Sequence, residues 1–205
     1  MAGDETALIV EVPAAEVVVG RHRAGLDRAA ALGVPAHVTV LYPFRPVDVL
    51  ALEDHDRLDD LFGGVPAFTL VLSRCAWFGD AVLYLAPEDP APLRALTGSV
   101  ARAFPEHPPY EGTFEDVVPH LTVGHDHPRQ VLAAAEREVV RGLPVTQHVG
   151  EVSLWRGPPL LPTATSRWRR VRRWALAPPP SVSLAAGTGV EASIVSGVRT
   201  DDRDA

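Results

Sequence analysis

The sequence contains no lysine, since all 19 of its basic residues are arginines. This absence excludes mechanisms that depend on a lysine, such as a Walker-type phosphate loop or a ligase that carries its nucleotide on a lysine. The sequence also has a single cysteine, Cys75, so an internal disulfide is impossible and a reducing cytoplasm is the expected location. Cys75 lies in an apolar run, where a buried thiol is expected rather than a reactive one.

Long apolar runs and broadly basic regions are missing as well. No stretch approaches the roughly 18 apolar residues of a membrane-spanning helix, and the acidic N-terminus lacks the basic start of a secretory signal. The formal net charge of −7 argues against a protein that binds duplex DNA through its phosphates, but it allows a small phosphate ester in a cleft. We expect a monomer with neither a membrane nor duplex DNA as a partner.

What the sequence does contain is a repeated tetrapeptide, His-apolar-Thr-Val, at residues 37–40 and 120–123. A proline precedes each copy by one or two residues. Two copies that share this context are not expected by chance. In a β-strand, residues i and i+2 share a face. His37 and Thr39 therefore point to one side of their strand, and His120 and Thr122 to one side of theirs.

Two histidines and two threonines around one volume suit phosphoryl chemistry that needs no metal and no cofactor. Histidine titrates near neutral pH, so one ring can act as a base while the other acts as an acid. Threonine hydroxyls can donate to the non-bridging oxygens of a phosphate. Gly124 follows the second motif, and we expect it to let a ligand approach closely.

The remaining pattern is typical of a mixed α/β protein. Alternating and β-branched stretches predict strands at residues 6–12, 37–41, 67–77, 81–86, 120–123, 145–155 and 168–176. Helices are predicted at 14–32, 49–62, 92–104 and from about 128 to 141, the last capped by Asp126 or His127. A strand-helix-strand unit with a motif strand occurs twice, which predicts a single domain of two pseudo-symmetric lobes over residues 1–177. Residues 178–205 are predicted to be a disordered tail.

The chain resembles the two-histidine (2H) phosphoesterases, which include the 2′-5′ RNA ligases and cyclic phosphodiesterases. The resemblance is carried by PAHVTVLYPF at residues 35–44 and PHLTV at residues 119–123, and extends in order and spacing over about residues 6 to 177. It implies a bilobal α+β fold, in which two antiparallel-rich sheets flank a central groove and the helices lie outside. It also implies that His37 and His120 are the acid/base pair and that Thr39 and Thr122 bind the substrate phosphate.

The function expected from the motif and the resemblance is hydrolysis of a 2′,3′-cyclic phosphate or a related nucleotide or RNA phosphoester, without a metal. The same site run in reverse would ligate 2′-5′ ends. Two alternatives stay open: a module that binds RNA or a nucleotide in the groove without turnover, and a phosphoesterase for a substrate that is not a nucleotide. Which histidine is the acid cannot be read from the sequence.

Two other groups of residues suggest a different kind of site. His120, His125, Asp126 and His127 are close enough in sequence for a metal site, but helix capping and a solvated loop are the expected roles of the last three. In residues 167–174, RWRRVRRW, arginines alternate with tryptophans. This segment could bind an RNA strand, or it could be an edge strand whose arginines deter sheet-to-sheet pairing. Tyr42, Phe44, Trp77 and Phe78 are expected in the core, with one or two at the groove rim.

Overall fold

The computed structural model describes residues 3–113 and 117–179, so the predicted disordered tail lies almost entirely outside the described residues. Two four-stranded sheets form the framework, and every pair of neighbouring strands is antiparallel. The first sheet has the order β2 (His37–Leu41), β1 (Glu5–Glu11), β7 (Glu151–Gly157), β8 (Arg169–Ala175). The second has the order β5 (Leu121–His125), β4 (Val82–Pro87), β3 (Phe68–Phe78), β6 (Val145–Val149).

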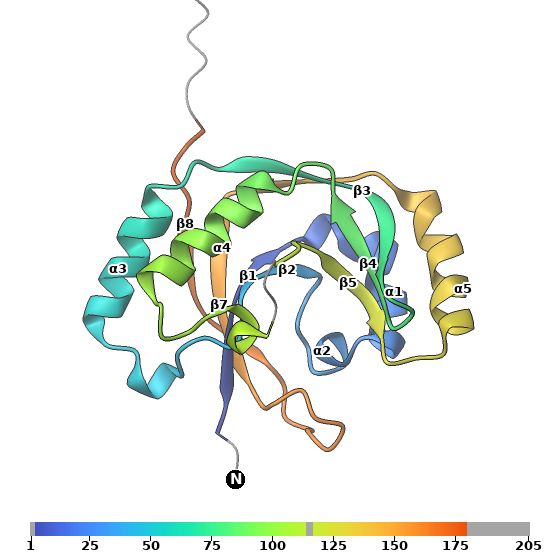
Figure 1. Cartoon of the computed structure of the whole chain (residues 1–205), viewed down its shortest axis with the longest axis horizontal. Coiled ribbons are helices and arrows are strands. Elements are labelled where there is room, and N and C mark those ends of the chain that lie inside the picture. The colour runs from blue at the N-terminus through green and yellow to red at the C-terminus, as the bar shows by residue number, and fades with distance from the viewer. Residues whose placement is uncertain (1–2, 114–116, 180–205) are drawn as a thin grey trace, which may run out of the picture.

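The two sheets are related by an approximate two-fold arrangement. Each motif strand lies at the edge of its sheet: β2 pairs only with β1 in the first sheet, and β5 pairs only with β4 in the second. The two motif edges lie beside each other in the middle of the molecule (Figure 1). The predicted two-lobed α+β fold is therefore confirmed.

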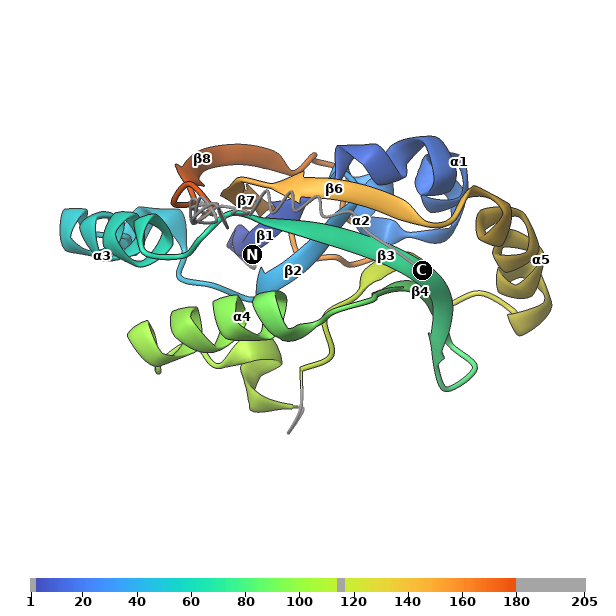
Figure 2. The ribbon, with the colours of Figure 1, turned by 90° about the horizontal axis from the view of Figure 1, so that it is seen from above.

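In the part of the chain that the structure describes, five α-helices lie outside the sheets: α1 (Glu16–Leu26), α2 (Arg28–Ala31), α3 (Leu52–Gly63), α4 (Ala91–Ala103) and α5 (Arg129–Val139). Their buried residues recur at helical spacing, as Leu93, Leu96 and Val100 do in α4. Seen from above, α3 and α5 lie at opposite ends of the molecule, and the long strand β3 runs between them beside β6 (Figure 2). None of the helices in the described residues has the length and apolarity needed to cross a membrane.

The helices are exchanged between the lobes. α1 follows β1 of the first sheet but packs on β5 of the second, and α4 follows β4 of the second sheet but packs on β2 of the first. Each motif strand is therefore supported by a helix from the other half of the chain. The two lobes also share one hydrophobic core.

Two predicted elements are wrong. The helix expected over residues 14–32 is broken at Asp27, whose backbone is extended and whose side chain caps α2 by accepting a hydrogen bond from the Ala29 amide. The single strand expected over residues 145–155 is two strands, because the chain leaves the second sheet as β6 and enters the first as β7 after Gly150. The alternation of apolar and polar residues over 145–155 does not reveal such a change of partner.

Candidate active site

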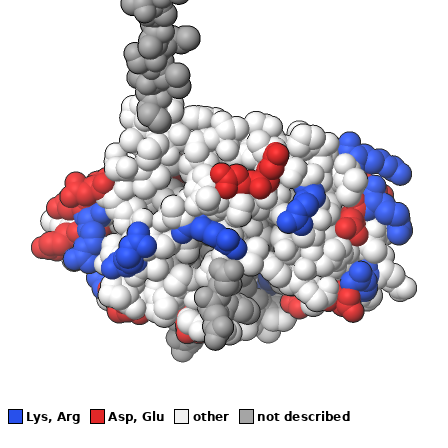
Figure 3. All heavy atoms as spheres, turned by 45° about the horizontal axis from the view of Figure 1, so that its top comes forward, with Lys and Arg blue, Asp and Glu red and all other residues white. Residues whose placement is uncertain are grey.

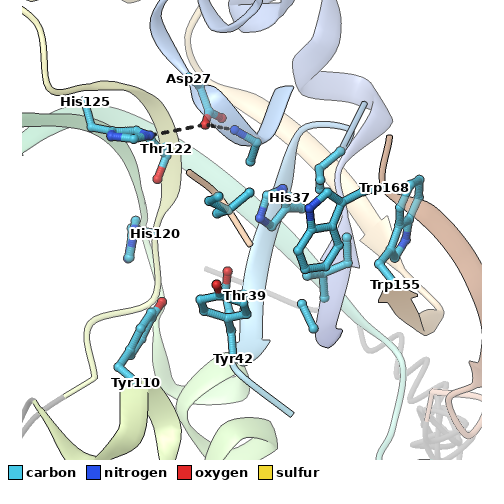
Figure 4. Close-up of a pocket in the computed structure, with 15 residues that line it drawn as sticks. Asp27, His37, Thr39, Tyr42, Tyr110, His120, Thr122, His125, Trp155 and Trp168 are labelled. Atoms are coloured by element: carbon cyan, nitrogen blue, oxygen red, sulfur yellow. Dashed lines mark hydrogen bonds and ion pairs between the residues drawn. The ribbon is translucent and has the colours of Figure 1, made fainter. Parts of the chain in front are cut away.

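A cavity of about 200 Å³ lies between the two motif strands, and we call it the central cavity. His37, Thr39, His120 and Thr122 all line it, as the sequence predicts (Figure 4). His37 and Thr39 lie on the face of β2 that also carries the first sheet's smaller apolar cluster, because Thr39 is paired with Ile9 of β1. Their neighbours Val38 and Val40 are buried in the main core on the opposite face.

The second motif is held in a similar way. His120 directly precedes β5, and Thr122 is paired with Tyr84 of β4, while Leu121 and Val123 are fully buried. The two half-buried histidines thus come from facing edge strands, each with the threonine of its motif beside it (Figure 4).

Both imidazole rings are oriented by the same main-chain contact. The His37 Nδ1 atom lies 2.7 Å from the carbonyl oxygen of Pro35, and the His120 Nδ1 atom lies 2.7 Å from that of Val118. A carbonyl can only accept a hydrogen bond, so Nδ1 must carry the proton in each ring. This leaves Nε2 of each neutral histidine with a lone pair for proton transfer.

A buried ion pair lies at the cavity, and its carboxylate, Asp27, is one of the lining residues. Arg23 of α1 is only 2% exposed and donates to Asp27 Oδ2 from Nε at 3.0 Å and from Nη2 at 2.7 Å. Arg23 Nε also donates to the main-chain oxygen of Thr122, at 3.2 Å. This side chain therefore joins the first half of the chain to the second motif strand.

His125 completes this network on the cavity wall. Its Nε2 atom lies 3.6 Å from Asp27 Oδ1 (Figure 4). Its Nδ1 atom lies 2.7 Å from Asp126 Oδ2. Pairing with Asp27, together with Asp126, raises the pKa of His125 to about 9 against the effect of burial. His125 is therefore an imidazolium at neutral pH. Because none of the described residues that line the central cavity is an arginine, His125 supplies a positive charge that no arginine in the lining provides.

The pKa values of His37, His120 and Asp27 are lowered, in contrast to that of His125. Burial, with the positive charge of Arg23, lowers the pKa of His37 to about 4, although the Pro35 carbonyl and Asp27 oppose this shift. Burial also lowers the pKa of His120, against the Val118 carbonyl. For Asp27, burial acts to raise the pKa, but His125 and Arg23 outweigh it and the net pKa is lowered. Both motif histidines thus favour the neutral form.

Aromatic side chains form much of the remaining wall. Tyr42, Tyr110, Trp155 and Trp168 line the central cavity, and the Tyr42 hydroxyl donates to Glu5. Tyr110 and Thr39 share a hydrogen bond, which acts to lower the Tyr110 pKa, while burial dominates and raises it. Tyr42 therefore lies at the cavity, whereas Phe44 is buried in the core as expected.

Three expectations near the second motif are wrong. Gly124 does not face a ligand, because a Cβ atom at this position would lie 2.7 Å from Leu26 Cβ of α1. The missing side chain allows α1 to pack closely against β5. Neither Asp126 nor His127 caps α5, whose N-cap is Pro128 without a side-chain bond. His125 is a cavity residue and not part of a solvated loop.

The arginine-rich segment is mainly an edge strand. β8 ends the first sheet, and three of its arginines form ion pairs with acidic side chains: Arg170 with Glu11, Arg172 with Asp59, and Arg173 with Glu151. Trp174 is buried, so it is not available to stack on a base. On the face that Figure 3 shows, blue and red side chains are interspersed and form no continuous basic surface.

No local sequence pattern points to Arg23, Asp27 or Tyr110 as residues of the site. Arg23 and Asp27 lie within a predicted helix, and Tyr110 lies in a proline-rich loop. Within residues 3–113 and 117–179, no three His, Cys, Asp or Glu side chains are grouped so that they could hold a metal ion.

Comparison with known proteins gives a family and a fold. The family model described as the 2′-5′ RNA ligase superfamily matches residues 10–158. E. coli LigT complexed with 3′-AMP is similar in structure, with a TM-score of 0.57 and 20% sequence identity over 84% of this chain and 98% of LigT. LigT complexed with NADP+ (TM-score 0.54, 20% identity, 86% and 99% covered) and a phosphoesterase (0.54, 21%, 85% and 99%) are also similar. A search of curated sequences found no match.

Proposed function

Because the chain belongs to the 2′-5′ RNA ligase superfamily, we propose that it is a phosphodiesterase that acts on a 2′,3′-cyclic phosphate or a related nucleotide or RNA phosphoester. The observation that carries this proposal is the pair of histidines in the central cavity, each with Nδ1 bound to a main-chain carbonyl and Nε2 left for proton transfer. In the proposed reaction one histidine takes a proton from water, and the other gives a proton to the departing ribose oxygen.

Charge on the phosphate is balanced by groups that need no metal ion. The Thr39 and Thr122 hydroxyls donate to the non-bridging oxygens, and the His125 imidazolium adds a positive charge at the cavity wall. With the 5′-hydroxyl of a second nucleotide in place of water, the same two proton transfers would open the cyclic phosphate and form a 2′-5′ linkage. The nucleotide ligands of E. coli LigT, 3′-AMP and NADP+, support a nucleotide as the substrate.

The proposal is tested by screening 2′,3′-cyclic nucleotides, 2′-5′ dinucleotides and ADP-ribose cyclic phosphates in the presence of EDTA. Turnover should persist in EDTA, and kcat should fall about 10²- to 10⁴-fold in both H37A and H120A. The exposed His127 offers a matched control, since H127A should keep full activity. Full activity in H37A or H120A, or loss in EDTA, would contradict the mechanism. Nucleotide binding without product in the wild type would instead support the non-catalytic binding module.

A further inference from the structure

A separate pocket of about 240 Å³ lies between α1, α2 and the residues just before β2, and we call it the back pocket. Its charged lining residues are Glu16, Arg23 and Arg167. Of the described lining residues, Val34 is the only one that the back pocket shares with the central cavity. The volume is below the roughly 300 Å³ of the smallest pockets that bind an organic ligand of drug size, so a small occupant is expected.

The Arg23 guanidinium has one nitrogen that the buried network does not use. Only 2% of Arg23 is exposed, and its Nε and Nη2 atoms donate to Asp27 and to main-chain oxygens. Its Nη1 atom makes no hydrogen bond with a described residue and lies 3.7 Å from Glu16 Oε1, which already accepts from the Ala36 amide at 2.5 Å. Because an almost fully buried guanidinium is stabilised by an acceptor for each donor, a ligand oxygen at Nη1 would be favourable.

Arg167 places a second guanidinium at the same pocket. It belongs to the arginine-rich segment, but unlike Arg170, Arg172 and Arg173 it forms no ion pair or hydrogen bond within the described part of the chain. A Cβ atom at Gly33 would lie 2.8 Å from Arg167 Nη2, so the glycine allows the guanidinium to lie against the main chain. Two guanidinium groups with unused donors therefore line one small pocket, which is an arrangement that suits the oxygens of a phosphate.

We propose that the back pocket binds a small phosphate-like oxyanion, for which inorganic phosphate is the probe, between Arg23 Nη1 and the Arg167 guanidinium. The carboxylate of Glu16 limits the affinity, because it places a like charge on the pocket wall. The site does not depend on the proposed function, since none of its three charged residues lines the central cavity.

An anion in the back pocket would act on the active site through Arg23. Burial and the charge of Arg23 lower the pKa of His37, with a smaller contribution from His120, while Asp27 opposes them. A bound anion offsets part of the Arg23 charge, so the pKa of His37 should rise when the back pocket is filled. Proton transfer at His37 would then respond to a ligand that does not touch the substrate.

Equilibrium dialysis against radiolabelled inorganic phosphate tests the site. The background is T39V/T122V, which removes the hydroxyls proposed to hold a phosphate in the central cavity. In this background phosphate should still bind, and R167M should weaken its binding by at least about 10-fold, because charge-assisted hydrogen bonds are lost. R169M, which removes an exposed arginine that lines neither pocket, should leave binding unchanged. E16Q should strengthen binding about 2- to 5-fold, since it removes the like charge.

The outcomes separate the back pocket from the central cavity. No phosphate binding in the T39V/T122V background, or equal binding in R167M and R169M, would overturn the proposed site. NMR titration of His37 in the same background tests the coupling: phosphate should raise the pKa of His37, and R167M should abolish the rise. A rise that survives in R167M would show that phosphate acts from the central cavity, and the coupling would be wrong. Neither measurement requires turnover, so a failure of the proposed function would be seen separately.

Discussion

The two copies of the motif hold their histidines alike but sit in different surroundings. Each Nδ1 atom contacts the carbonyl oxygen two residues before it. Behind His37 lie the charges of Arg23 and Asp27, whereas His120 rests against Phe78 and Tyr84. A short repeat therefore sets the orientation of each ring, while residues distant in sequence set how readily each ring holds a proton.

The largest effect should come from removing the charge behind His37. R23M removes the two hydrogen bonds that Arg23 donates to the buried Asp27 carboxylate and leaves it only His125 and the Ala29 amide, so the free energy of unfolding should fall by up to about 3–5 kcal/mol. The pKa of His37 should rise, because the guanidinium charge that lowers it is gone. Urea unfolding and NMR titration of the histidine measure the two effects. Arg21 provides the control: its ion pair with Glu138 is exposed, so R21M should cost no more than about 1 kcal/mol.

An intermediate effect should appear in the pH dependence of stability, where His37 and His125 act in opposite directions. The pKa of His125 is raised from 6.5 to about 9 on folding, so its contribution is present below pH 6.5 and is lost as the pH rises through about 9. The pKa of His37 is lowered to about 4, so its contribution is present above pH 6.5 and is lost as the pH falls through about 4.

Urea unfolding at a series of pH values measures both limbs. H125Q should flatten the alkaline decline and leave the acid decline in place, whereas H127Q, at an exposed position, should change neither. An alkaline decline that survives in H125Q would show that the pairing of His125 with Asp27 does not contribute to stability.

The smallest effect should come from the hydrogen bond between Tyr110 and Thr39. Y110F removes it, and because a neutral hydrogen bond contributes about 0.5–1.5 kcal/mol, kcat/KM should fall about 2- to 10-fold. The double variant T39V/Y110F should be no worse than T39V alone, since both changes remove the same bond. Additive losses would mean that Tyr110 acts on the substrate by another route.

Local patterns in the sequence were enough to predict most of the strands and the four motif residues of the cavity. These features depend on alternation, turn residues and spacing, which can be recognised within a short stretch of sequence. The break at Asp27 and the change of sheet after Gly150 depend on partners far along the chain. The exchange of α1 and α4 between the lobes could not be read for the same reason. The burial of Arg23 could not be predicted, because no neighbouring residue in the sequence distinguishes it from an exposed helical arginine.

The main-chain acceptors of the two histidines have a genetic consequence. Many enzymes orient a catalytic histidine with a carboxylate side chain, which a single substitution can delete. Here the acceptors are the carbonyl oxygens of Pro35 and Val118, which every amino acid at those positions would supply. Substitutions can therefore reshape the central cavity, and with it the choice of substrate, while the tautomer of each ring is inherited with the course of the backbone.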